Sequence, residues 1–162
     1  MKIGVISDTH GHCHPRVFQV FEGVELILHA GDIGDETIIT DLEALAPVKA
    51  VVGNIDGPPL TDRYPPLDEV SLEGHLLLMT HQAGPPERLP EEIGALLEER
   101  KHAALVFGHT HLPLARHQDG VLYLNPGYAG RQRFGWKRSV ALLQVTEHGL
   151  EAAIHLLEDS LR

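Results

Sequence analysis

Short apolar runs alternate with amphipathic segments over the first third of the chain. Continuous apolar runs at residues 2–7, 25–30 and 48–52 predict buried strands. The segments 15–23 and 35–46 carry apolar residues at helical spacing, and the second begins with an aspartate, a favoured helix N-cap. Buried strands that alternate with helices predict a parallel sheet covered on both faces.

The pattern changes in the rest of the chain, where strands pair as hairpins around turns that contain glycine. The expected hairpins join residues 69–72 to 76–80, 114–117 to 121–124, and 139–146 to 150–157. These antiparallel pairs predict that parallel and antiparallel pairing occur together in this protein.

One more helix and one more buried strand are predicted between the hairpins, at residues 91–101 and 103–107. Two segments rich in proline and glycine, 58–66 and 82–90, are expected to be loops. Because no repeat, low-complexity tract or linker divides the sequence, we expect a single domain over residues 1–162.

Composition and charge narrow the class of protein. Hydrophobic residues make up 43% of the 162 residues, and no apolar run approaches the ~20 residues of a membrane helix. The first apolar run is too short for a signal peptide, so we expect a cytoplasmic protein without a membrane partner. The single cysteine, Cys13, excludes an intramolecular disulfide and a thiolate metal cluster. A net charge of −10 argues against a long nucleic acid as partner, but bound metal ions would still allow a small phosphorylated substrate.

Polar side chains that can bind metal follow five of the predicted strands. They are Asp8 and His10, Asp32, Asn54, His81, and His109 with His111. In open α/β sheets the ligand crevice lies at the carboxyl ends of the strands, so we expect these side chains to meet at one edge. Oxygen and imidazole ligands without cysteine favour Mn, with Fe, Zn or Ni as alternatives. Two such divalent ions require a bridging carboxylate and about four protein ligands each.

Each of these residues also has a purely structural reading. Asn54 fits a left-handed turn, and His81 can be satisfied by a backbone hydrogen bond at the end of a strand. His109 and His111 are harder to explain in this way, because two imidazoles follow a buried strand two residues apart.

The ordered motifs resemble those of the calcineurin-like metallophosphoesterases. They are Ser7-Asp8-Thr9-His10, Gly31-Asp32, Gly53-Asn54, Thr80-His81 and Gly108-His109-Thr110-His111. The chain length and Asn125-Pro126-Gly127 resemble the small prokaryotic YfcE-like branch, and the resemblance covers essentially the whole chain. It implies an α/β fold in which a sandwich of sheets is flanked by helices (αββα), and an activity on small phosphate diesters.

The resemblance also implies a role for each candidate residue. The first metal would be held by Asp8, His10, Asp32 and His111, and the second by Asp32, Asn54, His81 and His109, with Asp32 bridging. A bridging hydroxide would be the nucleophile, and Asn54 would act as a catalytic residue that also contacts the phosphate.

The sequence departs from the family pattern at three places near the expected site. Ile55 stands where many members have a histidine that assists the leaving group, Gln82-Ala83 follow His81, and Tyr128 replaces a common serine. Our hypothesis is that His12, on the loop of His10, acts as a catalytic residue and partly replaces the missing proton donor.

Several other side chains have open roles. We expect His29 to be buried and hydrogen-bonded rather than a ligand. Surface positions are expected for His14, His75, His102, His117, His148 and His155. A basic cluster, formed by Arg131, Arg133, Lys137 and Arg138, either contacts an anionic substrate group or is a solvated face. Within it, Trp136 and Phe134 either stack on a base or anchor a homodimer contact.

Three other functions compete with a phosphodiesterase. A phosphomonoesterase or a nucleotide pyrophosphatase would use the same metal site on a different ester. A non-catalytic scaffold, like the retromer subunit of this fold, is the rival that is not an enzyme. Dinucleotide binding is set aside, because no Gly-x-Gly-x-x-Gly follows the first strand.

Overall fold

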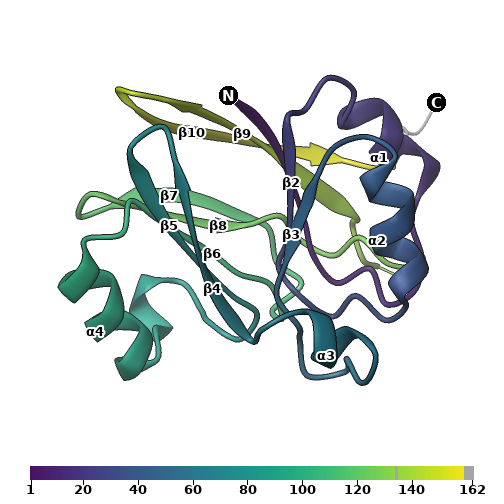
Figure 1. Cartoon of the computed structure of the whole chain (residues 1–162), viewed down its shortest axis with the longest axis horizontal. Coiled ribbons are helices and arrows are strands. Elements are labelled where there is room, and N and C mark those ends of the chain that lie inside the picture. Colours follow the sequence, from purple (N-terminus) through teal and green to yellow (C-terminus); the bar gives the residue numbers. More distant parts are fainter. Residues whose placement is uncertain (134, 159–162) are drawn as a thin grey trace.

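The computed structural model describes residues 1–133 and 135–158, which form two five-stranded sheets that face each other, with helices on the outside (Figure 1). The first sheet has the order β10-β9-β1-β2-β3. Its strands are β1 (Lys2–Ile6), β2 (Leu26–His29), β3 (Val48–Ala50), β9 (Ser139–Thr146) and β10 (Gly149–Leu156). The strands β1, β2 and β3 run parallel, and β9 pairs antiparallel with both β1 and β10.

The second sheet has the order β4-β5-β6-β8-β7. Its strands are β4 (Leu67–Leu72), β5 (His75–Thr80), β6 (Ala104–Val106), β7 (Leu114–Gln118) and β8 (Val121–Asn125). Parallel pairing joins β5 to β6 and β6 to β8, and antiparallel pairing adds β4 and β7 at the two edges. All three predicted hairpins are therefore confirmed.

Burial on both faces of the strands explains why they read as continuous apolar runs. In β1, Ile3 and Val5 point into the core between the two sheets, whereas Ile6 points to the outer face. In β6, Val106 points between the sheets and Leu105 points outward. Successive strand residues alternate in direction, so a strand with both faces covered needs apolar residues at every position.

The helices cover the outer faces, which gives the αββα arrangement. The helices α1 (Pro15–Val20) and α2 (Glu36–Glu43) pack on the first sheet, and α4 (Glu91–Arg100) packs on the second. Asp35 caps α2 as predicted, since its side chain accepts a hydrogen bond from the backbone N–H of Thr37 (2.9 Å). No helix in residues 1–133 or 135–158 combines the length and the apolar character required to cross a membrane.

Three sequence predictions need correction. The short helix α3 (Leu60–Arg63) interrupts the predicted loop 58–66, because Leu60 is buried in the core beneath it, and a 3-10 turn at Pro86–Arg88 interrupts the second predicted loop. His102 is buried rather than on the surface, with Nε2 3.5 Å from a Glu69 carboxylate oxygen. This contact joins the end of α4 to β4, a pairing that the local sequence pattern does not encode.

Candidate metal centre

The predicted metal-binding residues leave both sheets at the carboxyl ends of their strands. Asp8, Asp32 and Asn54 follow β1, β2 and β3 of the first sheet, whereas His81 and His109 follow β5 and β6 of the second. The loops after β1 and β2 lie side by side, since backbone hydrogen bonds join Asp8 N–H to the Gly31 carbonyl and His10 N–H to the Asp32 carbonyl (both 3.0 Å). The site is therefore built at the junction of the two sheets.

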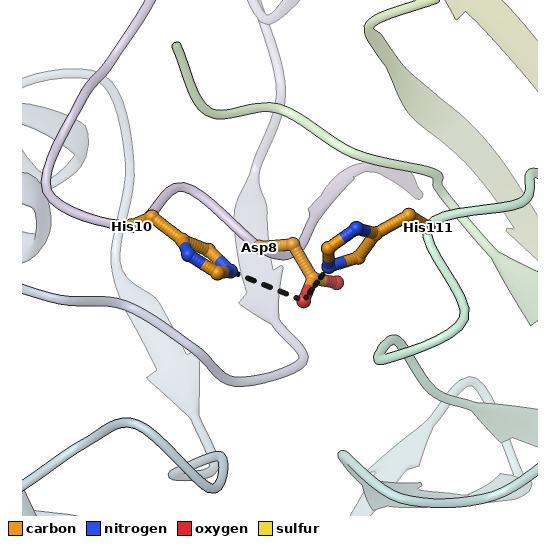
Figure 2. A group of neighbouring side chains, drawn as sticks. All are labelled: Asp8, His10 and His111. Atoms are coloured by element: carbon orange, nitrogen blue, oxygen red, sulfur yellow. Dashed lines mark hydrogen bonds and ion pairs between the residues drawn. The ribbon is translucent and has the colours of Figure 1, made fainter. Parts of the chain in front are cut away.

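Asp8, His10 and His111 form one group whose potential ligand atoms all lie within 4.8 Å of one another. Asp8 lies between the two histidines in Figure 2, with Oδ1 3.2 Å from Nε2 of His111 and 3.7 Å from Nε2 of His10. Its other oxygen, Oδ2, accepts hydrogen bonds from Ser7 Oγ (2.8 Å) and from the His109 backbone N–H (3.1 Å). This completely buried carboxylate is thus fixed on one side and presents Oδ1 to the histidines.

Asp32, His81 and His109 form the second group, also with ligand atoms within 4.8 Å of one another. The Nδ1–H of His81 donates to the Ala30 carbonyl oxygen (2.8 Å), so Nε2 is the ring nitrogen that faces the ligand group, 3.2 Å from Asp32 Oδ2. The backbone bond expected in the structural reading of His81 is present, but it uses only one of the two ring nitrogens.

The two groups lie next to each other, since the carboxylate of each group is close to a histidine of the other. Asp32 Oδ2 lies 3.5 Å from Nε2 of His10, and Asp8 Oδ1 lies 3.8 Å from Nε2 of His81. Asn54 is exposed beside the second group, where its Oδ1 accepts a hydrogen bond from Nδ1 of His109 (3.1 Å). The structure therefore brings together all seven residues that the sequence predicts as ligands, with Asp32 between the groups.

The unsatisfied nitrogens at this site fit bound cations. The Nε2 atoms of His10 and His81 are buried, and neither has a hydrogen-bond partner among the described residues. A buried polar atom without a partner costs roughly 1–3 kcal/mol, and a coordinated cation would remove that cost. The donor set of imidazole nitrogens and carboxylate oxygens suits divalent metal ions.

Asp32 and His81 shift each other's pKa values. Burial alone raises the pKa of Asp32, but His81 and the Ile55 N–H that donates to Oδ1 (3.1 Å) bring the pKa below its ordinary value. Burial alone lowers the pKa of His81, but the carboxylates of Asp32 and Asp8 raise it above its ordinary value. The carboxylates thus attract positive charge to the point where the two groups meet.

Glycines in the motifs allow the ligand loops to approach one another. A Cβ added to Gly108 would overlap Ser7 Oγ and lie 2.7 Å from Asp8 Oδ2. A Cβ added to Gly53 would overlap the backbone nitrogen and the carboxylate of Asp32. These close approaches explain why glycine precedes His109 and Asn54 in the sequence.

Two residues that support the loops were not singled out as such in the sequence. The Asp56 carboxylate accepts backbone N–H hydrogen bonds from Ile33 (3.1 Å), Gly34 (2.9 Å) and Gly53 (2.8 Å), and so ties the loop after β2 to the loop after β3. Asn125 is completely buried, and its Nδ2 donates to the Gly108 carbonyl (3.2 Å) and to Thr110 Oγ1 (2.9 Å). The sequence signals were the turn-forming Asp56-Gly57 and the motif Asn125-Pro126-Gly127, and neither indicates these hydrogen bonds.

His29 lies beneath the site and is confirmed as a buried, hydrogen-bonded residue. Its Nδ1 accepts from the Gly31 backbone N–H (3.2 Å), and its Nε2–H donates to Thr9 Oγ1 (3.0 Å), which in turn donates to the Ile33 carbonyl (2.8 Å). Burial lowers the pKa of His29 to about 3, so the ring stays neutral and keeps this chain of hydrogen bonds.

The proposed proton donor and the basic cluster lie outside the two metal-binding groups. His12 is half-buried and belongs to neither metal-binding group, and burial followed by the charges of Arg131 and Arg138 lowers its pKa. Arg138 is buried, and its Nε donates to Glu158 Oε1 (2.8 Å), so it supports the fold rather than a solvated face. Phe134 lies outside the described residues.

Comparisons of sequence place the chain among metal-dependent phosphoesterases. A family model for the calcineurin-like phosphoesterase superfamily domain matches residues 1–148. A probable metallophosphoesterase of Methanothermobacter thermautotrophicus is 36% identical over 159 residues, which cover 95% of this chain and 91% of the relative. The phosphodiesterase YfcE of Escherichia coli is 31% identical over 170 residues and covers 88% of this chain and 87% of its own.

Comparisons of structure find the same fold. A structure described as a novel archaeal phosphodiesterase superposes with a TM-score of 0.78 at 26% identity, over 96% of this chain and 99% of its own. Vps29 of Entamoeba histolytica, in a complex with zinc, has a TM-score of 0.74 at 19% identity, over 98% of this chain and 100% of its own. At that identity, the likeness to Vps29 shows the fold alone.

Proposed function

Because the chain belongs to the calcineurin-like phosphoesterase superfamily, we propose that it is a phosphodiesterase that hydrolyses small phosphate diesters with two divalent metal ions. The observation that carries the proposal is the pair of ligand groups that meet at Asp32. Relatives described as phosphodiesterases support the reaction class.

The residues divide between two cations. Asp8, His10, Asp32 and His111 would hold the first, whereas Asp32, Asn54, His81 and His109 would hold the second. Asp32 is the proposed bridge, since Oδ2 lies near the Nε2 atoms of both His10 and His81. Mn²⁺ is the preferred ion, with Fe, Zn or Ni as alternatives.

Two divalent cations at such a site polarise the phosphoryl oxygens and lower the pKa of bound water so that it can attack phosphorus near pH 7. Residues of the chain would orient the phosphate and the metal ligands. Asn54 carries an exposed amide whose N–H groups can donate to a phosphoryl oxygen. Ser7 and the His109 N–H hold the Asp8 carboxylate at a fixed angle.

The leaving group needs a proton donor, and the histidine that many family members use for this is replaced by Ile55. We assign this role to His12, which lies two residues past His10 on the same loop. Its imidazole belongs to neither of the two metal-binding groups.

Two alternatives use the same fold. A phosphomonoesterase or pyrophosphatase would show its highest rate on a monoester or an anhydride rather than on a diester. A scaffold related in fold to Vps29 would hydrolyse none of these esters, even with metal bound, since Vps29 itself is described in a complex with zinc. The presence of all seven ligand types favours catalysis over the scaffold.

The test is hydrolysis of bis-p-nitrophenyl phosphate and p-nitrophenyl phosphate by metal-stripped protein before and after Mn²⁺ is added. We expect Mn²⁺-dependent turnover of the diester, with the monoester slower. Asp32→Asn is expected to lower the rate at least ~100-fold, because the proposed bridge is lost. The matched control is Asp41→Asn, which makes the same change on the exposed side of α2.

A monoester rate above the diester rate would replace the proposal with a phosphomonoesterase. Absence of turnover with Mn²⁺, Fe²⁺, Zn²⁺ and Ni²⁺ would favour the scaffold, and the search would then turn to protein partners.

A further inference from the structure

Large apolar side chains are exposed next to the proposed ligands. Five are exposed in the described part of the chain, and three of these flank the proposed ligands: Ile55 follows Asn54, Leu112 follows His111, and Trp136 packs against the His111 ring. Exposed apolar residues beside the proposed ligands, with Trp136 in contact with one of them, indicate that the substrate carries an apolar group next to the phosphate.

Trp136 packs against two aromatic rings although 38% of its surface is exposed. Its ring centroid lies 4.9 Å from that of His111 and 4.9 Å from that of Tyr128, with interplanar angles of 64° and 90°. Tyr128 is itself buried, and its hydroxyl donates to the Arg131 carbonyl (2.8 Å). The indole therefore lies in direct contact with His111, a proposed ligand of the first metal.

Arg133 adds a cation at the same place. Its guanidinium carbon lies 4.9 Å from the ring centroid of Trp136 and 5.6 Å from that of Tyr128. The side chain is exposed, and it makes no ion pair with a carboxylate within residues 1–133 and 135–158. A planar guanidinium over an indole is a combination that proteins use to stack on nucleobases.

We propose that Trp136 and Arg133 form a subsite for an aromatic substituent of the diester, such as a nucleobase, so that the preferred substrates are nucleotide phosphodiesters. The ring of the substrate stacks on Trp136 and against the Arg133 guanidinium while the phosphate occupies the metal centre. The inference rests on the proposed function, since it places the phosphate at the metal-binding groups.

The first test measures binding without turnover. Trp136 is the single tryptophan of the sequence, so tryptophan fluorescence reports on this position alone. In the presence of Zn²⁺, we expect AMP to quench the fluorescence in a saturable manner. Ribose 5-phosphate, which has the same sugar and phosphate without a base, is expected to have a much smaller effect. Equal effects of the two compounds would overturn the subsite.

The second test uses two diesters with one leaving group, thymidine 5′-(p-nitrophenyl phosphate) and methyl p-nitrophenyl phosphate. The wild-type protein is expected to have the higher kcat/KM on the thymidine ester. Trp136→Leu should lower the ratio of the two kcat/KM values about 10-fold, which is the effect of losing one base–aromatic stack. Trp136→Phe should restore most of that ratio.

A structural role for Trp136 predicts a different result. If the indole only positions His111, Trp136→Leu lowers both kcat/KM values equally, the ratio stays at the wild-type value, and the proposal is wrong. Arg133→Gln is also expected to lower the ratio. Its charge-matched control is Arg131→Gln, in the same loop but without a described ring contact.

The two tests separate this inference from the proposed function. If no diester is hydrolysed with any metal but AMP alone quenches Trp136, the reaction is wrong and the aromatic subsite stands. If diesters are hydrolysed with no preference for the thymidine ester and AMP has no specific effect, the reaction stands and the subsite is wrong.

Discussion

At the scale of single residues, most of the proposed ligands carry their metal-binding side chains on a strained, left-handed backbone. Five of the seven have positive φ angles: Asp8 (55°), His10 (47°), Asp32 (54°), His109 (69°) and His111 (62°). A left-handed conformation costs a non-glycine residue roughly 1–2 kcal/mol. Such residues concentrate at functional sites, where the surrounding structure fixes them. Here the backbone hydrogen bonds of Asp8 and His10 to the neighbouring loop provide that constraint.

The role assigned to His12 gives a prediction at this scale. His12→Ala should reduce turnover most for diesters whose leaving group is a strong base, by about 100-fold, since those groups must be protonated as they depart. The measurement is kcat/KM for a series of substituted phenyl diesters with rising leaving-group pKa. His148→Ala, at an exposed histidine of the β9–β10 turn, serves as control. An equal loss across the series would show that His12 donates no proton.

At the scale of elements, the site depends on loops that contact one another across the two sheets. The loop after β6 approaches the loop after β1 so closely that Gly108 has no room for a Cβ beside Ser7 and Asp8. Asn125, at the end of β8, holds the same loop through Gly108 and Thr110. The position of His109 and His111 therefore follows from packing between elements far apart in the sequence.

Gly108→Ala should displace the Asp8 carboxylate and weaken Mn²⁺ binding at least 10-fold. Overpacking of this kind also costs about 1–3 kcal/mol in the free energy of unfolding. Gly57→Ala is the matched control, because no atom lies within 4 Å of a Cβ added there. Calorimetric titration with Mn²⁺ and thermal unfolding check both effects. Wild-type metal affinity in Gly108→Ala would show that the close approach is not required.

At the scale of the whole molecule, the candidate metal centre takes its residues from both sheets. Asp8, Asp32 and Asn54 come from one sheet, whereas His81 and His109 come from the other. Cations bound between them would link the halves of the sandwich and bind only when both are folded. The stability of the protein should therefore depend on metal.

We expect Mn²⁺ at 100-fold its Kd to add about 2.7 kcal/mol to the free energy of unfolding. For a chain of this size, the change corresponds to a rise in Tm of roughly 5–10 °C. Thermal unfolding followed by circular dichroism, with chelator and then with Mn²⁺, measures the shift. Asp32→Asn should show a much smaller rise, and an unchanged wild-type Tm with each of Mn²⁺, Zn²⁺ and Ni²⁺ would contradict the metal-binding role.

The elements and the candidate ligands were accessible from the sequence because their signals are local. A strand buried on both faces must be apolar at successive positions, as at Ile3 and Val5, and a helix N-cap such as Asp35 has a characteristic side chain. The ligands follow strand ends, and their order matches a known family. These features need only neighbouring residues to be recognised.

Only the tertiary structure decided which distant segments meet. It brought Asp32 between His10 and His81, buried His102 against β4, and placed Trp136 with Arg133 beside His111. Contacts of this kind depend on how two sheets pack and on backbone angles at their loops. Hydrophobic periodicity carries no information about either, because it records which face of an element is buried and not what covers it.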